Sequence, residues 1–549
     1  MTETFRITLI CRDRALERRA LAGALLSDVL RAEGFAPSFD CGGRGRCGRC
    51  AVPVRLPGQT RFESRRTCQT RIDRDGFAVD VSALRRQTRS RGEEPLAAPA
   101  ERGMVDERFP ATSEERRGSL GLAIDLGTTT LASALVSLAS GRVLATTTRR
   151  NPQASFGRDV VSRIAAASGS GAATMRRLVC EELGRMATTL VDALGASTRQ
   201  IEDVVVAGNT TMEFLLTGRD PAPLGAAPFD VGDHFFEERR AAAFPFGVEL
   251  APSARARVFP VFSAFVGGDV LAGFEYLRRF GFEEGTRLFL DVGTNGEAIL
   301  AANGRYFATS TAAGPAFEGA EISQGALAVP GAIAAIEYNA ERQIWRPRTI
   351  ASTAATCVCG SGLVDALAGA LEFGLVAPSG RVASHDDPSV AAEFRARLRG
   401  VGRQRAFLIS EPSELASTGG VWLTQNDVRQ AQLAICAMKT GLRLTLMAAG
   451  IEERALDALM LAGAFGASLN VESSRRVGMF PASVPVENVS FWGNTSLLGA
   501  IDAVAGRLDW SRAAEDVGRV EHVDLATRPE FTDVFADCGR FPERRRNEQ

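Results

Sequence analysis

The sequence predicts a multidomain α/β protein, in which a small α+β domain at the N-terminus precedes a larger two-lobed α/β part. The chain has 549 residues, several times the usual size of one domain. Four cysteines gather near the N-terminus, and an apolar strand followed by Asp-x-Gly-Thr occurs twice in the larger part. A hydrophobic content of 45% and a net charge of −1 are ordinary for a globular chain and do not indicate nucleic acid or an anionic membrane as a partner.

Several other classes are disfavoured by what the sequence lacks. No uncharged apolar run is long enough for a membrane-spanning helix, and the N-terminus does not resemble a signal peptide, so we expect a cytoplasmic protein. Lys439 is the only lysine, and no Gly-Lys-Ser/Thr occurs, which excludes a P-loop. The only histidines are His234, His385 and His522, so a zinc-protease motif is absent and a Ser-His-Asp triad is disfavoured.

The N-terminal cysteines predict an iron–sulfur site. Cys41, Cys47, Cys50 and Cys68 have the spacing C-x5-C-x2-C-x17-C, and glycines surround the first three. Three thiolates on one tight loop must face one object, and a glycine-rich backbone lets N–H groups approach its sulfur atoms. We therefore expect these four residues to hold a [2Fe–2S] cluster. A zinc site and unligated thiols remain alternatives, although zinc would more typically show a second C-x2-C or a histidine pair.

The segments around these cysteines predict a ferredoxin-like domain over residues 1–84. Residues 5–10, 51–56 and 77–81 alternate like strands, and residues 24–34 have the pattern of a short amphipathic helix. This is the β-grasp order, and the cysteine loop resembles that of plant-type ferredoxins. The 17-residue spacing before Cys68 is short for that class.

A connector follows this domain. Residues 85–118 contain one aromatic residue, no apolar periodicity and dense charge of both signs. This composition predicts a flexible linker. An ordered connector wrapped on a neighbouring domain is the alternative.

The first Asp-x-Gly-Thr segment predicts a phosphate-binding hairpin. A buried strand ends at Asp125, Gly127 follows as the turn residue, and Thr128, Thr129 and Thr130 lead into a second strand. The threonines offer N–H and O–H donors to phosphate oxygens, and Asp125 stands where Mg²⁺ or its water ligands would lie.

The same pattern returns later in the chain. An apolar strand reaches Asp291, and Gly293, Thr294 and Asn295 form the turn before the next strand. Two equivalent hairpins imply two similar lobes that face one nucleotide. The pattern resembles the acetate kinase, sugar kinase, Hsp70 and actin superfamily, which implies an actin-like ATPase fold. We place lobe I at 119–260, lobe II at 261–538 and a tail at 539–549.

The resemblance to this superfamily implies further parts of the nucleotide site. A strand that runs into Gly463 and Gly466 resembles the adenosine-binding segment. Residues 265–277 and 493–506 resemble the two crossing helices of the interlobe hinge, because both open with glycine and are rich in small residues.

Asp269, near the start of the first of these helices, is our candidate catalytic base. In sugar kinases of this fold an aspartate at the corresponding place acts as the base, so Asp269 is expected to orient an attacking water together with the catalytic carboxylates Asp125 and Asp291. A helix N-cap is the alternative role. Asn209 and Thr210 could line the cleft or form a turn, and Glu297 could reach the metal or be a solvated strand residue.

The combination of motifs resembles the reductive activators of corrinoid enzymes. A ferredoxin-like domain precedes DLGTTT, AGNTTM, DVGTNGE, AGPAFEGAEIS, CGSGLVDAL and AGAFG in this order over nearly the whole chain. The resemblance implies that an iron–sulfur domain passes one electron to the Co(II) of a corrinoid protein or cobalamin-dependent methyltransferase, and that ATP with Mg²⁺ helps to return it to Co(I). An additional small domain of some members has no counterpart here. The electron donor is an unidentified low-potential partner, and a homodimer is left open.

The energetics explain why ATP would be needed. Co(I) is a strong reductant, so its formation from a cluster near about −400 mV is uphill, and each 100 mV costs about 2.3 kcal/mol per electron. Lobe closure on ATP can stabilise the partner in a more reducible state. The alternatives are a redox-gated small-molecule kinase or iron–sulfur sensor, and an activator of 2-hydroxyacyl-CoA dehydratases. The latter carry their cluster cysteines within the lobes, unlike this chain.

Overall fold

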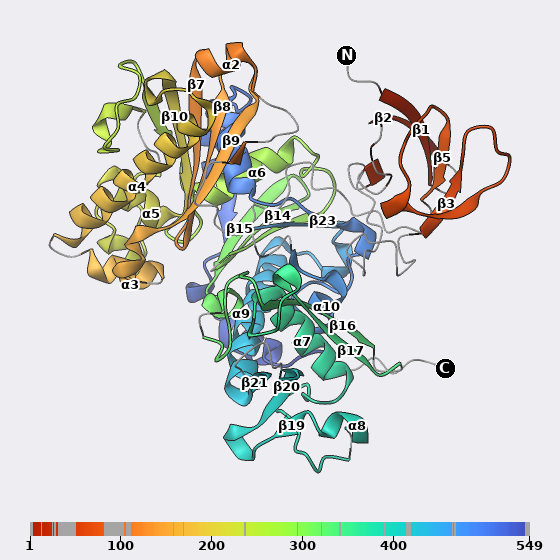
Figure 1. Cartoon of the computed structure of the whole chain (residues 1–549). Coiled ribbons are helices and arrows are strands. Elements are labelled where there is room, and N and C mark those ends of the chain that lie inside the picture. The colour runs from red at the N-terminus through yellow and green to blue at the C-terminus, as the bar shows by residue number, and fades with distance from the viewer. Residues whose placement is uncertain are drawn as a thin grey trace. The chain divides into compact units, whose positions relative to one another are not determined.

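The computed structural model describes the chain as two compact units, Met1–Arg91 and Gly92–Gln549 (Figure 1). The described residues are 4–11, 14–22, 24, 26, 29–30, 51–81, 104–105, 111–157, 159–167, 170–234, 238–293, 295–319, 321–339, 342–388, 390–412, 419–463, 465 and 468–543. Each unit has its own hydrophobic core.

The first unit is built on a five-stranded mixed sheet with the order β2-β1-β5-β3-β4. Its strands are β1 (Thr4–Cys11), β2 (Arg14–Leu21), β3 (Ala51–Arg55), β4 (Glu63–Arg66) and β5 (Phe77–Asp80). β1 runs antiparallel to β2 and parallel to β5. The three predicted strands are confirmed, whereas β2 and β4 escaped prediction because their arginines and glutamates hide the alternation. Within the predicted helix 24–34, Leu26, Val29 and Leu30 are helical and buried.

The second unit begins with a seven-stranded sheet of order β11-β12-β10-β7-β8-β9-β6. Its strands are β6 (Met104–Val105), β7 (Leu120–Leu126), β8 (Thr130–Ser137), β9 (Val143–Arg150), β10 (Ile201–Gly208), β11 (Arg239–Arg240) and β12 (Arg255–Val258). The β7–β8–β9 meander is antiparallel, and β10 lies parallel to β7 on its other side.

A six-stranded sheet of order β23-β22-β13-β14-β15-β24 repeats this arrangement. Its strands are β13 (Arg287–Val292), β14 (Gly296–Ala302), β15 (Arg305–Thr311), β22 (Ala458–Ala462), β23 (Val489–Phe491) and β24 (Val520–His522). Here β13–β14–β15 is the meander, and the parallel neighbour of β13 is β22. The prediction of two similar lobes with equivalent hairpins is therefore confirmed.

Two helices, α6 (Gly268–Arg278) and α11 (Thr495–Val504), lie between the two sheets and pack on residues of both. They cross where a Cβ added to Gly499 would stand 2.1 Å from the carbonyl oxygen of Ala272. Only glycine permits this approach, which confirms that the two predicted small-residue helices cross. Their role as a hinge remains a prediction.

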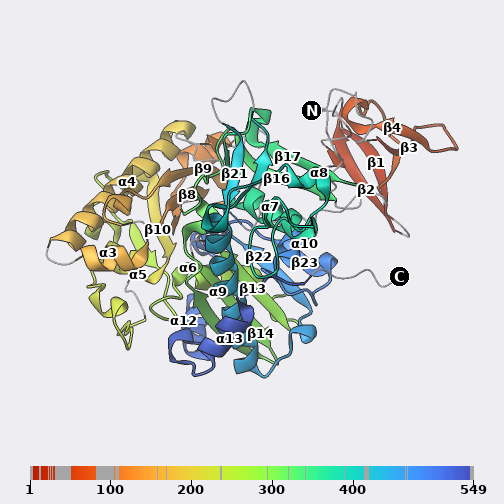
Figure 2. The same ribbon diagram turned by 90° about the horizontal axis from the view of Figure 1, so that it is seen from below.

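The outer faces of the sheets are covered by other helices (Figures 1 and 2). In the first lobe these are α4 (Gly171–Leu194) and α5 (Thr210–Thr217), and the short α3 (Val160–Ala166) packs beside α5. In the second lobe α7 (Gly360–Glu372) and α9 (Gln425–Ala449) pack on the sheet through a large apolar cluster.

The second lobe carries two small three-stranded sheets and several short helices. The sheets consist of β16 (Ala332–Asn339), β17 (Ile344–Thr349) and β18 (Cys357–Val358), and of β19 (Leu398–Arg399), β20 (Ala406–Ser410) and β21 (Val421–Thr424). The helices are α8 (Ala392–Arg395), α10 (Val471–Arg476), α12 (Trp510–Arg519) and α13 (Phe531–Cys538).

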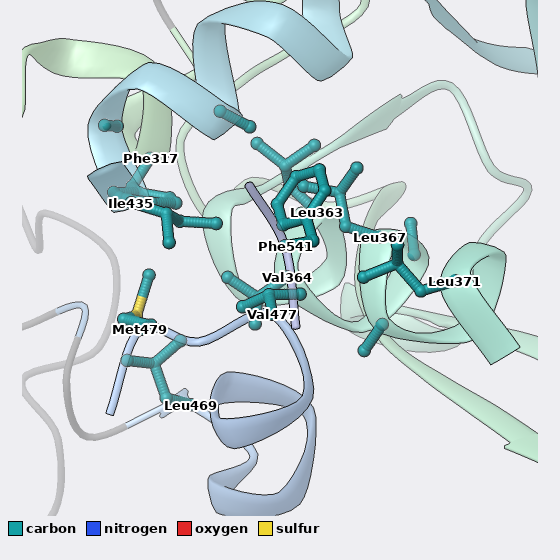
Figure 3. Packing of buried hydrophobic residues seen from close by; sticks show 14 of the residues in the cluster. Phe317, Leu363, Val364, Leu367, Leu371, Ile435, Leu469, Val477, Met479 and Phe541 are labelled. Atoms are coloured by element: carbon teal, nitrogen blue, oxygen red, sulfur yellow. The ribbon is translucent and has the colours of Figure 1, made fainter. Parts of the chain in front are cut away.

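Part of the predicted tail belongs to the core of this lobe. Phe541 is buried, and Figure 3 shows its ring among residues of the cluster that include Leu363 and Leu367. The amide of Phe541 donates to the carbonyl oxygen of Pro378 at 2.9 Å. Residues up to at least Phe541 therefore stabilise the second lobe.

The described part of the predicted linker 85–118 is ordered. β6 pairs with β9, and α2 (Ser113–Arg117) begins with a capping box between Thr112 and Glu115. These contacts correct the prediction of flexibility for the end of the linker and agree with the alternative of a connector wrapped on its neighbour. The charged composition gave no sign of this order, because the segment is held by polar contacts with residues distant in the sequence. The ion pair of Glu115 with Arg142 is an example.

None of the helices in the described part of the chain combines the length and the hydrophobicity that a membrane span requires.

Candidate functional site

The first hairpin forms where β7 meets β8. A Cβ added to Gly127 would stand 2.5 Å from the carbonyl oxygen of Thr130, so this turn requires glycine. Asn151 holds the turn from behind: its Nδ2 donates to the Gly127 oxygen and its backbone N–H to the Thr129 oxygen, each at 2.9 Å. Thr128 is buried, whereas Thr129 is half-buried and Thr130 is exposed.

Asp125 ties this hairpin to the helix α11. Its Oδ2 accepts a hydrogen bond from Asn494 Nδ2 at 2.7 Å, and its Oδ1 accepts one from Ser496 Oγ at 2.8 Å. Asn494 is also the N-cap of α11, because its Oδ1 accepts from the amide of Leu497 at 2.8 Å. Both oxygens of Asp125 are thus oriented by one turn.

Asn209 has an equivalent double role. It caps α5 through its Oδ1, and its Nδ2 donates to Thr128 Oγ1 at 2.8 Å. Asn209 therefore belongs to a turn, which was one of its two predicted roles, and it also contacts the first hairpin. Its position as a lining residue of the cleft stays a prediction. Thr210 is buried, and its hydroxyl donates to the Ser263 carbonyl at 2.6 Å, which makes it a structural residue of the turn.

Asn494 and Ser496 were not among the predicted site residues, although the sequence carries a signal for them. The tetrapeptides Gly208-Asn-Thr-Thr and Gly493-Asn-Thr-Ser are nearly identical, and each leads from a strand into a helix. Each supplies an asparagine that caps its helix and donates to the first hairpin. An internal comparison of the two halves would have found both.

The second hairpin places Asp291 close to the end of β13. Gly293 donates its amide to the Asn295 carbonyl at 2.9 Å, which closes the turn, and Thr294 lies outside the described residues. Gly463, with a φ of +85°, follows the parallel strand β22, and a Cβ there would stand 2.6 Å from Asp291 Oδ1. Gly463 is therefore adjacent to this hairpin, and Gly466 lies outside the described residues.

Asp269 occupies the first turn of α6 and is not its N-cap. The N-cap is Gly267, and Asp269 Oδ1 accepts from the adjacent amide of Val270, at 2.8 Å. The capping alternative is therefore wrong. A Cβ on Gly267 would stand 2.6 Å from Asn209 Cα, so α6 starts directly against the turn that supports the first hairpin.

The carboxylates of the two hairpins and of α6 share one electrostatic environment. Burial, followed by repulsion from Asp125, raises the pKa of Asp269 to about 7. Burial, followed by repulsion from Asp269 and Asp125, raises the pKa of Asp291 to about 8. Burial also raises the pKa of Asp125, opposed by its hydrogen bonds from Asn494 and Ser496. Three carboxylates that resist ionisation together form a cation-binding environment.

Glu297 on β14 belongs to the same group. Burial, Asp269 and Asp291 together raise its pKa well above the ordinary value. Its Oε1 accepts from Ser310 Oγ at 3.4 Å. Glu297 is thus a half-buried strand residue whose carboxyl interacts with the other acids, and its contact with the metal stays a prediction.

The donor set suits a magnesium ion that is carried by a nucleotide. Among the described residues, no group of three His, Cys, Asp or Glu side chains has the geometry of a protein-made metal site. Mg²⁺ in phosphate chemistry usually takes one or two carboxylates and fills its octahedron with phosphate oxygens and water. Asp125, Asp291 and the donor-rich turn at Gly127–Thr130 fit that pattern.

The predicted cluster ligands fall largely outside the structural description. Cys41, Cys47 and Cys50 are among the residues not described. Cys68 belongs to a short 3₁₀ helix, Thr67–Gln69, directly after β4.

Comparison with known proteins decides the family. Residues 120–278 match the family model described as the RACo middle region, and residues 285–548 match the one described as the C-terminal domain of RACo, the ASKHA domain. The chain is 31% identical over 438 residues to the corrinoid activation enzyme RamQ of Eubacterium limosum, covering 78% of this chain and 71% of RamQ. This chain belongs to the RACo family. The predicted resemblance is confirmed.

Two further proteins are similar to this RACo-family chain. The [Co(II) methylated amine-specific corrinoid protein] reductase of Methanosarcina barkeri is 27% identical over 429 residues, covering 76% of each chain. The solved structure of a reductive activator for corrinoid, iron–sulfur protein superposes with a TM-score of 0.69 at 24% identity, covering 98% of both chains. The latter likeness establishes the fold, so the actin-like ATPase architecture of the RACo-family chain is confirmed.

Proposed function

We propose that this chain is an ATP-dependent reductive activator that returns the Co(II) of a corrinoid protein or cobalamin-dependent methyltransferase to Co(I) by transfer of one electron. The proposal is supported by membership of the RACo family and by the activities for which two relatives are named, which are corrinoid activation and Co(II) corrinoid protein reduction. Corrinoid cobalt is the substrate here and belongs to the partner.

The observation that carries the ATP-dependent part is the convergence of the two hairpins. Asp125 and Asp291 end equivalent strands of the two sheets, and each raises the pKa of another acid in the group around Asp269. We propose that the phosphates lie between the hairpins and accept from Thr128, Thr129, Thr130 and the Gly293-Thr294-Asn295 turn. Asp125 and Asp291 would hold Mg²⁺ through water or directly, and the glycines Gly463 and Gly466 would admit the adenosine.

Asp269 is placed to act on water in this site. It is not engaged as a helix cap, and its raised pKa of about 7 lets it accept a proton near neutral pH. We propose that it orients the water that attacks the terminal phosphate. Glu213 lies directly behind it, fully buried, with Oε1 accepting from the Gly208 amide at 2.9 Å.

The electron-transfer part is assigned to the first unit. The mixed sheet with order β2-β1-β5-β3-β4, and a helix after the first hairpin, support a β-grasp ferredoxin domain. We propose that Cys41, Cys47, Cys50 and Cys68 hold a [2Fe–2S] cluster there, which when bound supplies one-electron transfer at low potential. An unidentified low-potential donor would reduce it.

The decisive experiment follows Co(I) formation by absorbance, anaerobically, with a corrinoid protein as substrate. The full chain with MgATP should form Co(I), whereas Asp125→Asn and Asp291→Asn should retain iron and sulfide but lose ATPase activity by about a hundredfold or more. Cys41→Ser should lose iron and Co(I) formation while it still binds nucleotide. Asp192→Asn, an exposed change on α4, serves as the charge-matched control.

Three results would overturn the proposal. Stoichiometric zinc in place of iron would remove the electron-transfer role. Normal ATP hydrolysis by both hairpin variants would remove the assigned nucleotide site. Efficient Co(I) formation that ignores ATP would make a redox-gated kinase or sensor the better description of the lobes.

A further inference from the structure

A completely buried arginine lies directly behind the first hairpin. Arg163, on the short helix α3, has no exposed surface. Its Nη2 donates to the carbonyl oxygen of Thr128 at 2.6 Å, and its Nε donates to that of Gly157 at 3.0 Å. Its Nη1 contacts Met212 Sδ at 3.0 Å and Gln153 Oε1 at 3.4 Å.

This guanidinium has four neutral partners and no carboxylate partner within the described part of the chain. Asp159, the N-cap of α3, acts on it electrostatically, but its Oδ1 accepts from the amide of Ser162 at 2.8 Å. Burial lowers the pKa of Arg163 to about 10, so it still carries its charge at neutral pH. Burial of a cation without a counter-ion is costly, and buried charges in proteins are normally paired.

The position of the charge indicates what compensates it. Arg163 binds the Thr128 carbonyl, and in a planar trans peptide the N–H of the next residue points the opposite way. The amide of Thr129 therefore points away from Arg163, toward the side where the turn would meet phosphate. An anion on that side would accept a hydrogen bond from the Thr129 N–H. It would also be attracted by the positive charge of Arg163 behind the turn.

We propose that Arg163 is a positioning residue for the nucleotide phosphates, which serve as its counter-ion through the first hairpin. It holds the Thr128 carbonyl inward, so that the turn presents its amides to phosphate, and its charge stabilises the anion that they bind. The proposal rests on the proposed nucleotide site and extends it to a residue that does not contact the phosphates.

The substitutions Arg163→Lys and Arg163→Gln separate charge from hydrogen bonding. Both remove the planar guanidinium and its set of donors, but only lysine retains the positive charge. Arg177→Gln is the matched control, because Arg177 is exposed on α4 and pairs only with Glu181 on the same helix. In the full chain, calorimetry measures the Kd for MgATP, MgADP and adenosine, and thermal unfolding is followed with and without MgATP.

We expect Arg163→Gln to weaken MgATP and MgADP binding by about tenfold or more and to leave adenosine binding unchanged, because adenosine carries no phosphate. Arg163→Lys should keep most of the preference for MgATP over adenosine. The nucleotide-induced rise in Tm should shrink in Arg163→Gln and persist in Arg177→Gln. A residue with a purely structural role would lower the Tm without nucleotide and would affect adenosine and MgATP alike.

Several results would overturn the proposal. One is unchanged MgATP affinity in a folded Arg163→Gln variant, and another is an equal loss of adenosine affinity. If the glutamine variant does not fold, the lysine variant decides: loss of its preference for MgATP over adenosine would also contradict the proposal. Failure of the wild-type chain to bind MgATP at all would instead refute the proposed nucleotide site, and this inference with it.

Discussion

The hydroxyl of Thr129 donates a hydrogen bond of 3.1 Å to the carboxylate of Glu318. Thr129 belongs to the first hairpin, whereas Glu318 ends a 3₁₀ turn, Pro315–Glu318, that follows the second meander. The contact therefore joins the first hairpin in one lobe to the other lobe. A phosphate oxygen bound by the first hairpin would need the same hydroxyl.

We predict that Glu318→Gln tightens MgATP binding. The change removes a negative charge beside the first hairpin, so the electrostatic repulsion of a bound phosphate falls. The glutamine oxygen can still accept the hydrogen bond from the Thr129 hydroxyl. The expected gain is about three- to tenfold in Kd, measured by calorimetry. Glu321→Gln, an exposed neighbour, is the control. Weaker binding by Glu318→Gln would show that the carboxylate assists the nucleotide or its metal.

The crossing of α6 and α11 gives a second prediction. A Cβ at Gly499 would stand 2.1 Å from the backbone oxygen of Ala272, so Gly499→Ala must separate the two helices. We expect the free energy of unfolding to fall by about 1–3 kcal/mol, measured in urea, with a loss of ATPase activity as the lobes shift. Gly518→Ala on α12 meets no atom within 4 Å and should be neutral or stabilising by about 0.5–1 kcal/mol. Equal effects of both changes would contradict the role of close packing.

The segment before β7 contributes to the stability of the second unit. Gln200 Nε2 donates to the carbonyl oxygens of Arg116 and Gly118, at 3.1 and 2.9 Å, and Glu115 pairs with Arg142. We predict that a chain starting at Ser119 is less stable than one starting at Gly92 by about 1–3 kcal/mol, measured as the urea midpoint. Both should bind MgATP, because each contains the two hairpins. Identical midpoints would mean that the ordered connector adds nothing.

The last prediction concerns pH. Burial raises the pKa of Glu275 on α6 to about 7, and Asp516 next to it adds to the shift, while Arg278 opposes it. Because this pKa is higher in the folded state than in the unfolded state, the protonated form of Glu275 favours folding. Its contribution to stability is complete below about pH 4.5 and is lost as the pH rises through about 7. Glu275→Gln mimics the neutral acid. The stability of this variant relative to wild type should therefore be higher at pH 8.5 than at pH 5.5. The expected difference between the two pH values is about 1–2 kcal/mol in the free energy of unfolding.

Glu284→Gln, which changes an exposed side chain, is the control for this series and should have the same small effect at both pH values. Thermal or urea unfolding at the two pH values checks the prediction. If Glu275→Gln destabilised the protein more at pH 8.5 than at pH 5.5, the ionised carboxylate would be the stabilising form, paired with Arg278.

The sequence by itself determined the features that depend on local pattern. Asp125 and Asp291 follow apolar strands and precede Gly-Thr turns, so the two hairpins and the repeated lobe were predictable from spacing alone. The small residues of 265–277 and 493–506 likewise predicted a close helix crossing, which the structure shows between α6 and α11. Each of these features depends on backbone geometry that neighbouring residues dictate.

Only the tertiary structure decided which distant residues support the hairpins. Asn494 reaches Asp125, Glu318 reaches Thr129, and Arg163 reaches the Thr128 carbonyl, all over long sequence separations. Such partners leave little local signal, because a hydrogen bond depends on where two strands and a helix end in space. The charge of Arg163 is the clearest case: in the sequence it is one arginine among many, and its complete burial is seen only in the structure.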